Sequence, residues 1–472
     1  MDGLDIEEIQ LANLENSFTL GAEYYGKIYI STANTIKKLN HMTLHSISKV
    51  ITDGDHGSPD YQDSGIIYLL SESVQEGYID TSKCRFITQK KNAELKRSEL
   101  HPRDIVVTKT GVYFGKSAVI PPNICKANMI AHVGKIELKG GYNPYYVSTF
   151  LNSKYGYYQM RRRGIKATRP EIKLVEFPEI MIPIFSNEFD RNIESTIENA
   201  IRILSVSVDM MRGCETNLLN TVGFKADTSS CSGYSIRLFG ESFCNSGRLD
   251  AEYYQPKYDA LFETLSRFKC AKLGGANGLV NITKSIEPGS EAYVEEGIPF
   301  VRVSDVSRFE LSEPEIKLRS DILPNPEVLF PQKDTILLSK DGSVGIAYKV
   351  ETPMSVITSG ALLHLKIRDK STILPDYLTL VLNSPIVQLQ AERDSNGAII
   401  QHWKPSEIEN VIIPILEMDL QKEIAAKVQE SFTLRKQSKQ LLEYAKQAVE
   451  IAIEQGEGVA LKWLKDKLPV EV

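Results

Sequence analysis

The chain contains an internal repeat that covers most of its 472 residues. The tetrapeptide Ala-Glu-Tyr-Tyr begins at Ala22 and again at Ala251, an offset of 251 − 22 = 229 residues. Lys109 and Lys340 each stand two residues before a glycine, and 340 − 109 gives 231. The segments "FPEIMIPI" and "IENVIIPI", near the end of each half, keep the offset of 231. Chance matches would not stay in phase over this distance, so the chain is a tandem duplication of a repeat of about 230 residues.

Both halves show the same order of predicted elements. Short apolar runs such as "GIIYLL", "DIVVTK", "GIPFVRV" and "DTILLS" are separated by Gly, Pro and Asp, which predicts strands joined by turns. A short helical stretch follows in each half, and a much longer helical pattern comes after "IMIPI" and "VIIPI". The fold class expected is therefore α+β, with two mixed α/β domains and two long helices.

The two long helices carry apolar residues at heptad spacing. Asn187 with Asp190 predicts a helix start, and Gly223 predicts its end. The first seam consists of Ile193, Ile197, Ala200, Leu204, Ser207, Met211, Cys214 and Leu218. Adding 231 gives the second seam, which is polar in its middle: Ile424, Val428, Ser431, Arg435, Ser438, Leu442, Ala445 and Val449. Because both stripes run for about 35 residues, longer than a typical helix, we expect the two helices to pack on each other. Ordinary packing on each domain's own core is the alternative.

These patterns predict the domain boundaries. The segments are an N-terminal segment 1–20, a first domain 21–185, a long helix 186–223, a linker 224–248, a second domain 249–416, a second long helix 417–456 and a tail 457–472.

Composition excludes several classes of protein. The acidic opening "MDGLDIEEIQ" is unlike a signal peptide, and no apolar run of about 20 residues is present to span a membrane. The six cysteines are scattered without a Cys-x-x-Cys pair, which favours reduced thiols in a cytoplasmic protein. The net charge of −6 argues against a surface coated for nonspecific nucleic-acid binding.

Three motifs resemble parts of active sites, but each fits a structural interpretation better. "GVYFGKS" has three residues between its glycines where a phosphate-binding loop needs four, and the equivalent "GSVGIAY" lacks Gly-Lys-Ser, so a turn is expected. "PEIK" occurs twice, but at non-equivalent places of the repeat. "DGDHG" has only "KSIEP" as its counterpart, which offers no metal ligands in the same pattern. We therefore predict no catalytic site, no metal and no cofactor.

In this order and in both halves, the segments resemble those of the DNA-specificity (S) subunits of type I restriction–modification systems. The resemblance rests on "ITDGDHGSPDYQDSGIIYL" with "GIPFVRVSDV", on "LHPRDIVVTKTG" with "FPQKDTILLSKDGSVG", and on "GIKATRPEIKLVEFPEIMIPI" with "GAIIQHWKPSEIENVIIPI". It covers nearly the whole chain. Two departures are "TKTGVYFGKS", where a charged Asp-Gly turn is usual, and helix starts that lack the family's Pro-Pro-Leu-x-x-Gln.

The resemblance implies a function and a set of partners. Each half would be a target recognition domain that reads one part of a split, asymmetric sequence in double-stranded DNA. The two long helices would form an antiparallel coiled coil that separates the domains. The chain itself would be non-catalytic. Two adenine-N6 methyltransferase subunits that use S-adenosylmethionine, and ATP-driven translocating restriction subunits, would supply the chemistry.

Ten basic residues are the candidates for DNA contact. The stretch from Ser153 to Lys173 combines tyrosines with a cluster of cations, although a solvated helix face is the ordinary interpretation of such a run. The candidates in it are Arg161, Arg162, Arg163, Lys166 and Arg169. Lys109 and Lys340, which precede the turn glycines, are candidates for a shared positioning role, and Arg302, Lys349 and Lys404 complete the set.

Three other functions remain open at this point. The chain could be the specificity subunit of a related modification system outside type I. It could be a coiled-coil scaffold without a role on DNA. It could also be an enzyme that uses the near-miss phosphate loop, in which case the purified chain would turn over ATP.

Overall fold

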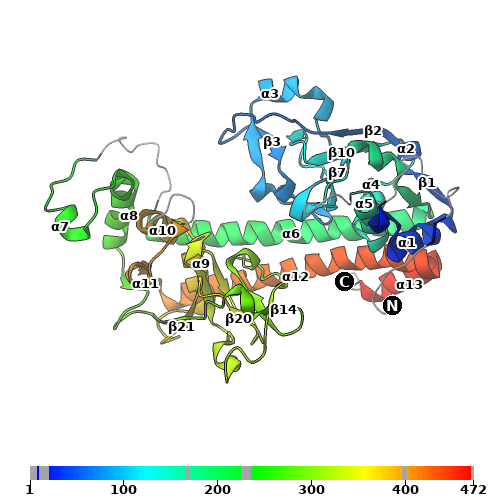
Figure 1. Cartoon of the computed structure of the whole chain (residues 1–472). Helices are drawn as coiled ribbons and strands as arrows, with labels where there is room; N and C mark the ends of the chain where they lie inside the picture. Colours follow the sequence, from blue (N-terminus) through cyan, green and yellow to red (C-terminus); the bar gives the residue numbers. More distant parts are fainter. Residues whose placement is uncertain (1–7, 10–20, 165–169, 225–234, 396–400, 469–472) are drawn as a thin grey trace. The chain divides into compact units, whose positions relative to one another are not determined.

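The computed structural model describes residues 8–9, 21–164, 170–224, 235–395 and 401–468 (Figure 1). The chain divides into two compact units. Unit 1 consists of Met1–Leu204 with Arg435–Val472, and unit 2 is the continuous stretch Ser205–Leu434. Each unit is a mixed α/β structure that contains one copy of the repeat.

Unit 1 is built on a four-stranded antiparallel sheet in the order β2-β10-β7-β8. Its strands are β2 (Ser48–Asp53), β10 (Val133–Leu138), β7 (Ile105–Thr108) and β8 (Ser117–Val119). A second sheet pairs β3 (Ile66–Leu69) antiparallel with β6 (Arg85–Ile87) and parallel with β9 (Ala127–Met129). The short pairs are β1 (His41–Thr43) with β11 (Met181–Pro183) and β4 (Val74–Gln75) with β5 (Tyr78–Ile79). The residues of β7 are fully buried because both faces of this strand are covered.

Ahead of its long helices, unit 1 also contains five α-helices among its described residues. They are α1 (Lys27–Lys37), α2 (Leu44–Ile47), α3 (Gln89–Glu94), α4 (Pro144–Asn152) and α5 (Lys154–Arg163). Of these, α4 packs on the main sheet at β8. The start of α4 is fixed by the side chain of Asn143, which accepts a hydrogen bond from the Tyr145 N–H at 2.9 Å. Phe150 and Leu151 on this helix are fully buried in the core.

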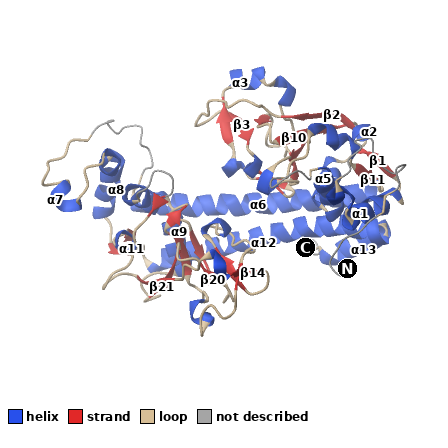
Figure 2. Ribbon diagram, in the orientation of Figure 1, coloured by secondary structure: helices blue, strands red, loops and turns tan. Residues whose placement is uncertain are grey.

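Unit 2 has the same kind of main sheet followed by two helices, whereas its second sheet and its short strand pairs differ from those of unit 1. Figure 2 shows that strands and helices occur together in both units. Its main sheet has the order β13-β21-β17-β19, and its second sheet has the order β14-β16-β15-β20 with β15 and β20 parallel. The strands are β12 (Cys270–Lys272), β13 (Val280–Lys284), β14 (Tyr293–Val294), β15 (Ile298–Val301), β16 (Lys317–Leu318), β17 (Ile336–Ser339), β18 (Asp341–Gly342), β19 (Ala347–Lys349), β20 (Ile357–Thr358), β21 (Leu362–Ile367), β22 (Gln401–His402) and β23 (Ile412–Pro414). The helices are α7 (Phe243–Ser246), α8 (Pro256–Ser266), α9 (Pro375–Asn383), α10 (Pro385–Asp394) and α11 (Pro405–Glu409).

The repeat extends to single hydrogen bonds. In unit 1 the Tyr146 hydroxyl donates to the carbonyl of Pro183 at 2.7 Å. In unit 2 the Tyr377 hydroxyl donates to the carbonyl of Pro414 at 2.8 Å. Since 377 − 146 and 414 − 183 both equal 231, the same tether closes each copy. The tandem duplication predicted from the sequence is therefore confirmed at the level of side chains.

Two long helices follow the two globular parts. Helix α6 spans Asn187–Val222 and helix α12 spans Met418–Gln455, with the short helix α13 (Glu457–Lys467) after it. The hydroxyl of Ser186 accepts a hydrogen bond from the Phe189 N–H at 3.2 Å, which caps α6. Gly223 follows the helix with φ of +76°, a conformation that favours glycine. The predicted start and end of this helix are confirmed.

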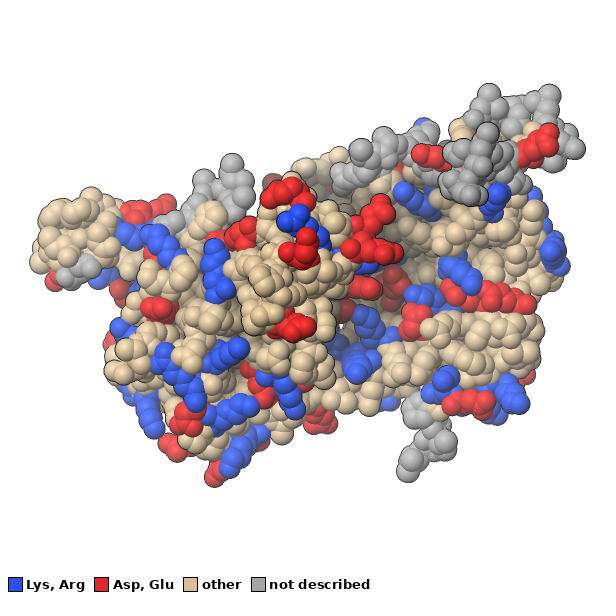
Figure 3. All heavy atoms as spheres, turned by 60° about the horizontal axis from the view of Figure 1, so that its bottom comes forward, with Lys and Arg blue, Asp and Glu red and all other residues tan. Residues whose placement is uncertain are grey.

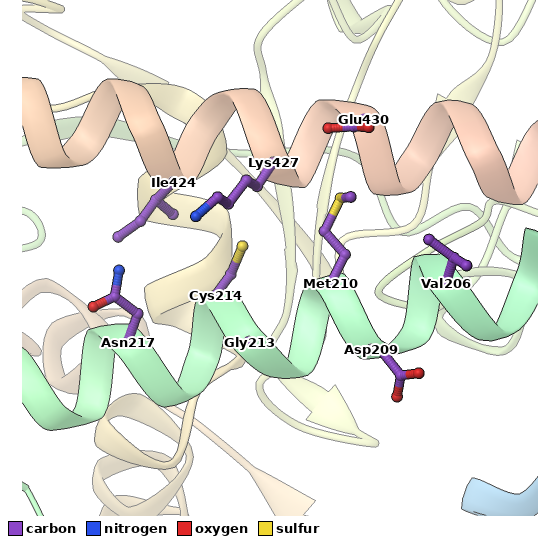
Figure 4. A pocket seen from close by; sticks show the side chains of 9 residues that line it. All are labelled: Val206, Asp209, Met210, Gly213, Cys214, Asn217, Ile424, Lys427 and Glu430. Carbon is purple, nitrogen blue, oxygen red and sulfur yellow. The ribbon is translucent and has the colours of Figure 1, made fainter.

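The two long helices pack on each other in antiparallel fashion. In unit 2 the Ser207 and Ser431 hydroxyls lie 3.0 Å apart, and each donates to the other residue's carbonyl at 2.9 Å. Further along α6 in the same unit, Cys214 faces the earlier turn of α12 that contains Ile424 (Figure 4). In unit 1 the Ser438 hydroxyl donates to the carbonyl of Ala200 at 2.7 Å. The fold class predicted from the sequence is confirmed.

The helices also contribute to the core of each unit, so both packing modes considered for the seams occur. In unit 1, Phe189, Ile193 and Ile197 are buried in the same apolar cluster as Ala445 and Val449. In unit 2, Cys214, Leu218, Ile424 and Val428 join the cluster formed by the sheet and its helices. In the part of the chain that the structure describes, no helix is long and apolar enough to cross a membrane.

Candidate functional site

A glycine turn follows the central strand of the main sheet in both units. In unit 1, Gly111 has φ of +74° and Gly115 has φ of +85°. In unit 2, Gly342 has φ of +75° and Gly345 has φ of +86°. Both copies need glycine at both positions, because other residues rarely adopt these angles. The expected turn in place of a phosphate-binding loop is confirmed, since β7 is followed by the single 3-10 turn Gly111–Tyr113.

A hydroxyl in the preceding strand closes each turn. The Thr108 hydroxyl accepts a hydrogen bond from the Lys116 N–H at 3.0 Å. The Ser339 hydroxyl accepts one from the Ile346 N–H at 2.8 Å. The two turns differ in length by one residue, yet the same bond defines both.

A returning segment lies beside each turn, joined by an isolated bridge between Thr110 and Glu171 in unit 1 and by the pairing of β22 with β18 in unit 2. The Ile172 N–H donates to the carbonyl of Lys109 at 3.0 Å, and the Trp403 N–H donates to the carbonyl of Lys340 at 2.8 Å. Ile172 and Trp403 are buried, and the next residue in each copy is an exposed lysine, Lys173 or Lys404. We refer to these surfaces as the turn-lysine sites: Lys109–Gly115 with Glu171–Lys173 in unit 1, and Lys340–Gly345 with Gln401–Lys404 in unit 2.

Lys109 is buried in an ion pair. Its ammonium lies 2.8 Å from a carboxylate oxygen of Asp53, and its side chain is 8% exposed. The guanidinium of Arg97 approaches the same carboxylate at 3.2 Å. Burial alone would raise the pKa of Asp53, but the hydrogen bonds from Lys109 and Arg97 lower it overall. In this structure Lys109 therefore holds β2 against the turn.

Lys340, the counterpart of Lys109, uses a local partner. It forms an ion pair with the neighbouring Asp341, and its side chain is 12% exposed. The imidazole of His402 lies 2.8 Å from the same carboxylate. Burial would raise the pKa of Asp341, whereas Lys340 and His402 lower it overall. Asp341 thus links the turn to the returning strand.

The three consecutive arginines at the end of α5 have different surroundings. Arg162 is buried, and its Nε donates to the carbonyl of Tyr24 at 2.8 Å. Arg163 has a side chain that is 8% exposed, with Nε 3.9 Å from Glu176. Arg161 is partly exposed. The other two candidates of this stretch, Lys166 and Arg169, lie outside the described residues.

The remaining candidates of unit 2 differ in access to solvent. Lys349 is buried, 2.6 Å from Asp376 and 3.1 Å from Glu351. Burial would lower the pKa of Lys349, but its two carboxylate partners raise it overall. Arg302 has a side chain that is 41% exposed, and that of Lys404 is 66% exposed. Among these three, Arg302 and Lys404 are accessible to a partner.

Lys173 was not singled out from the sequence. The signal was present, because 404 − 173 equals 231 and Lys404 was a candidate. Sequence reasoning favoured the dense run of arginines before it. The structure brings Lys173 and Lys404 to equivalent, exposed positions beside the turns.

A hollow of about 490 Å³ lies along the helix pair in unit 2 (Figure 4). Met210 and Cys214 point toward α12, whereas Asp209 points away from it. Lys427 and Glu430 contribute charged groups to its lining. Among the residues that the structure describes, no group of three His, Cys, Asp or Glu side chains is arranged to hold a metal ion.

Charged side chains of both signs are interspersed on the face shown in Figure 3. With a net charge of −6, the chain has no excess of cations to attract nucleic acid over its whole surface. Contact with a polyanion would therefore depend on a few lysine and arginine side chains at particular positions.

Comparisons with known proteins gave similarities to solved structures alone. No family model matches the chain, and no curated protein sequence matches it. The crystal structure of a type I restriction–modification system S subunit from M. genitalium is 14% identical, covers 92% of this chain and 97% of its own, and has a TM-score of 0.38. The HsdS subunit from Thermoanaerobacter tengcongensis is 14% identical over 91% of this chain and 97% of its own, with a TM-score of 0.28. A chain from a study of assembly and conformational transition of the type I R-M system is 15% identical over 89% and 98%, with a TM-score of 0.29.

Proposed function

We propose that this chain is the DNA-specificity subunit of a type I restriction–modification complex, in which each unit reads one part of a bipartite, asymmetric site. The observation that carries the proposal is the pair of turn-lysine sites, which share a backbone conformation but differ in side chains. A protein that reads two different words with two copies of one domain needs this combination.

The shared parts of the two sites suit phosphate contact. Phosphate contacts fix register without reading sequence, so they can be the same in both copies. Lys173 and Lys404 occupy equivalent positions and are exposed, which makes them our candidates for this role. Among the earlier candidates, Arg161 and Arg302 are also accessible.

The parts that differ suit base reading. At the tip of the turn, Val112 is 93% exposed, where unit 2 has Ser343. In the returning segment, Glu171 stands where unit 2 has His402. An apolar side chain can contact the thymine methyl group, and a carboxylate can accept a hydrogen bond from cytosine, so such replacements would change the word that is read.

The proposal assigns catalysis to partner subunits. Two adenine methyltransferase subunits would use S-adenosylmethionine, and ATP-driven translocating subunits would cut DNA. The specificity subunit would place double-stranded DNA for them and would carry no cofactor of its own.

The test is a methyl-transfer assay followed by mapping of the methylated sites. The purified chain with DNA and labelled S-adenosylmethionine should give no transfer until the methyltransferase subunit is added. The reconstituted complex should then methylate adenines in a two-part word with a fixed gap. Transfer by the chain alone, or a single uninterrupted word, would contradict the proposal.

A further inference from the structure

The repeated Ala-Glu-Tyr-Tyr segment meets an arginine in each unit. In unit 1 it forms the 3-10 helix Ala22–Tyr25. The guanidinium carbon of Arg162 lies 4.1 Å from the centroid of the Tyr24 ring and 5.6 Å from that of Tyr25. The two tyrosine rings pack edge to face, with centroids 5.1 Å apart. Arg162 is 7% exposed, so this cation is held almost entirely within the protein.

Unit 2 contains a related contact, in which the arginine lies between the tyrosine and a second ring, that of Phe262, at 4.3 Å. The segment forms the 3-10 helix Ala251–Tyr254, and its rings again pack edge to face at 5.0 Å. The guanidinium carbon of Arg393 lies 4.9 Å from the Tyr253 ring. Since 393 − 162 equals 231, the two arginines are equivalent. Arg248 adds a second cation over Tyr253, at 4.5 Å.

The helix that carries each arginine also contacts the glycine turn. In unit 1, Tyr157 on α5 packs edge to face on Phe114 of the turn, at 6.3 Å between centroids. A Cβ atom built on Gly115 would lie 3.1 Å from the Tyr157 ring. In unit 2, the Gln388 side chain on α10 donates to the carbonyl of Gly345 at 2.8 Å. Because 388 − 157 equals 231, equivalent residues connect helix and turn in both copies.

We propose that the Arg162–Tyr24 and Arg393–Tyr253 contacts position the turn-lysine sites and thereby set how strictly each unit reads its half of the DNA word. The proposal rests on the proposed function, because it takes the turn-lysine sites as the surfaces that face DNA. Tyr24 and Tyr253 act here as positioning residues. Their effect passes through the arginine to α5 or α10, and from that helix to the turn.

The chemistry of the contact suits a positioning role. An arginine has a planar guanidinium that stacks on an aromatic ring in a defined orientation, which a lysine ammonium does not reproduce. In unit 1 the contact is reinforced by the hydrogen bond from Arg162 Nε to the backbone of Tyr24. The end of α5 is thereby held both by the stack on the Tyr24 ring and by the hydrogen bond to the Tyr24 carbonyl. A turn that contacts this helix would be placed with the small positional error that base reading requires.

The experiment compares two substitutions in unit 1 with one substitution in unit 2. The variants are Tyr24→Leu, which removes the ring, Tyr24→Phe, which keeps it, and Tyr253→Leu in unit 2. Each full chain, with its methyltransferase subunits, selects duplexes from a pool in which both half-sites are randomised, and the bound duplexes are sequenced. For Tyr24→Leu we expect the preference for the correct bases to fall by about tenfold in one half-site, which corresponds to about 1.4 kcal/mol. The base preference in the other half-site should not change. Tyr253→Leu should lower the base preference in that other half-site and leave the first unchanged. Tyr24→Phe should keep the base preferences of the wild type.

Several results would overturn the inference. If the contact has a purely structural role, Tyr24→Leu would reduce binding to all duplexes alike and would leave the base preferences in both half-sites unchanged. Relaxation of both words by Tyr24→Leu would also contradict the inference, because the two contacts belong to separate units. If Tyr24→Leu does not fold, Arg162→Lys replaces it, since this change keeps the charge but loses the planar stack. Unchanged words for that variant would then count against the proposal. Failure of the wild-type complex to select any two-part word would instead refute the proposed function.

Discussion

The two turn lysines, Lys109 and Lys340, make the same backbone bonds but pair their charges with carboxylates from different places in the chain. The spacing of the repeat identified Lys109 and Lys340 as equivalent, and their backbone hydrogen bonds are indeed the same. Their charges have different partners, because the carboxylate that buries Lys109 comes from Asp53, 56 residues earlier in the chain. Lys349 is likewise buried by Asp376, 27 residues away. Such partners depend on strand pairing that no local pattern reveals.

The exposed lysines of the turn-lysine sites give a prediction for binding. Lys173→Ala and Lys404→Ala should each weaken binding to all DNA sequences by a similar factor. Each should also reduce the slope of log K against log salt concentration by about 1, since one phosphate contact fewer is made. The methylated word should not change. Titrations of labelled duplex at several salt concentrations measure the slope, with Lys37→Ala, an exposed lysine at the end of α1, as the control. An unchanged slope for both variants would show that Lys173 and Lys404 do not contact DNA phosphates.

Asp190 at the start of α6 gives a prediction for stability. Its pKa is raised to about 7, first by burial and then by the nearby carboxylates of Glu457 and Glu194. An acid with a raised pKa in the folded chain costs stability as the pH rises from about 4, its value in unfolded chains, to about 7. Asp190→Asn removes this cost and should stabilise unit 1 at pH 8, by on the order of 1 kcal/mol. It should change stability little at pH 4.

Thermal unfolding of the wild type and the variant at both pH values measures this difference. Glu188→Gln, on the exposed face of the same helical turn, is the control and should not stabilise the chain at pH 8. An Asp190→Asn variant that is no more stable than the wild type at pH 8 would show that the ionised carboxylate does not destabilise the folded chain.

At the scale of elements, periodic patterns were sufficient for the long helices. Helix α6 was predicted from its heptads and from the residues at its ends, all of which are local signals. The polar middle of the second seam had no clear meaning in the sequence. The structure explains it, because Ser431 and Ser438 are buried and donate hydrogen bonds to carbonyls of α6. A serine that bonds across a helix pair cannot be distinguished by periodicity from one that faces water.

The continuous helices give a prediction for spacing. Four residues are inserted in α6 after Leu204 and four in α12 after Leu434, so that the pairing in each unit is kept. A helix rises about 1.5 Å per residue, so each helix lengthens by about 6 Å. DNA rises about 3.4 Å per base pair, so the gap between half-sites should grow by one to two base pairs. Sequencing of methylated sites measures the gap. An active variant with an unchanged gap would show that the helices do not set the spacing, and an insertion in α6 alone is the mismatched control.

At the scale of the whole molecule, the two units use the chain differently. Unit 2 is the single stretch Ser205–Leu434, whereas unit 1 needs residues from both ends of the chain. Its core contains Ile193 and Ile197 from α6 together with Ala445, Val449 and Ala452 from α12. The repeat in the sequence therefore does not correspond to two independent domains in succession. Each unit combines one copy of the repeat with a part of each long helix.

This arrangement has a consequence for the order of events on the ribosome. The first globular part of unit 1 emerges early, but the helix segment that covers its apolar side is made last. The 434 − 204 = 230 residues of unit 2 come between them. At roughly 5–20 residues per second, the apolar side of the first-made unit waits about 10 to 50 s for its cover. During this interval Ile193 and Ile197 lack the partners that bury them in the finished chain. Unit 1 is thus begun before unit 2 and completed after it, so its apolar side stays uncovered while the whole of unit 2 is synthesised.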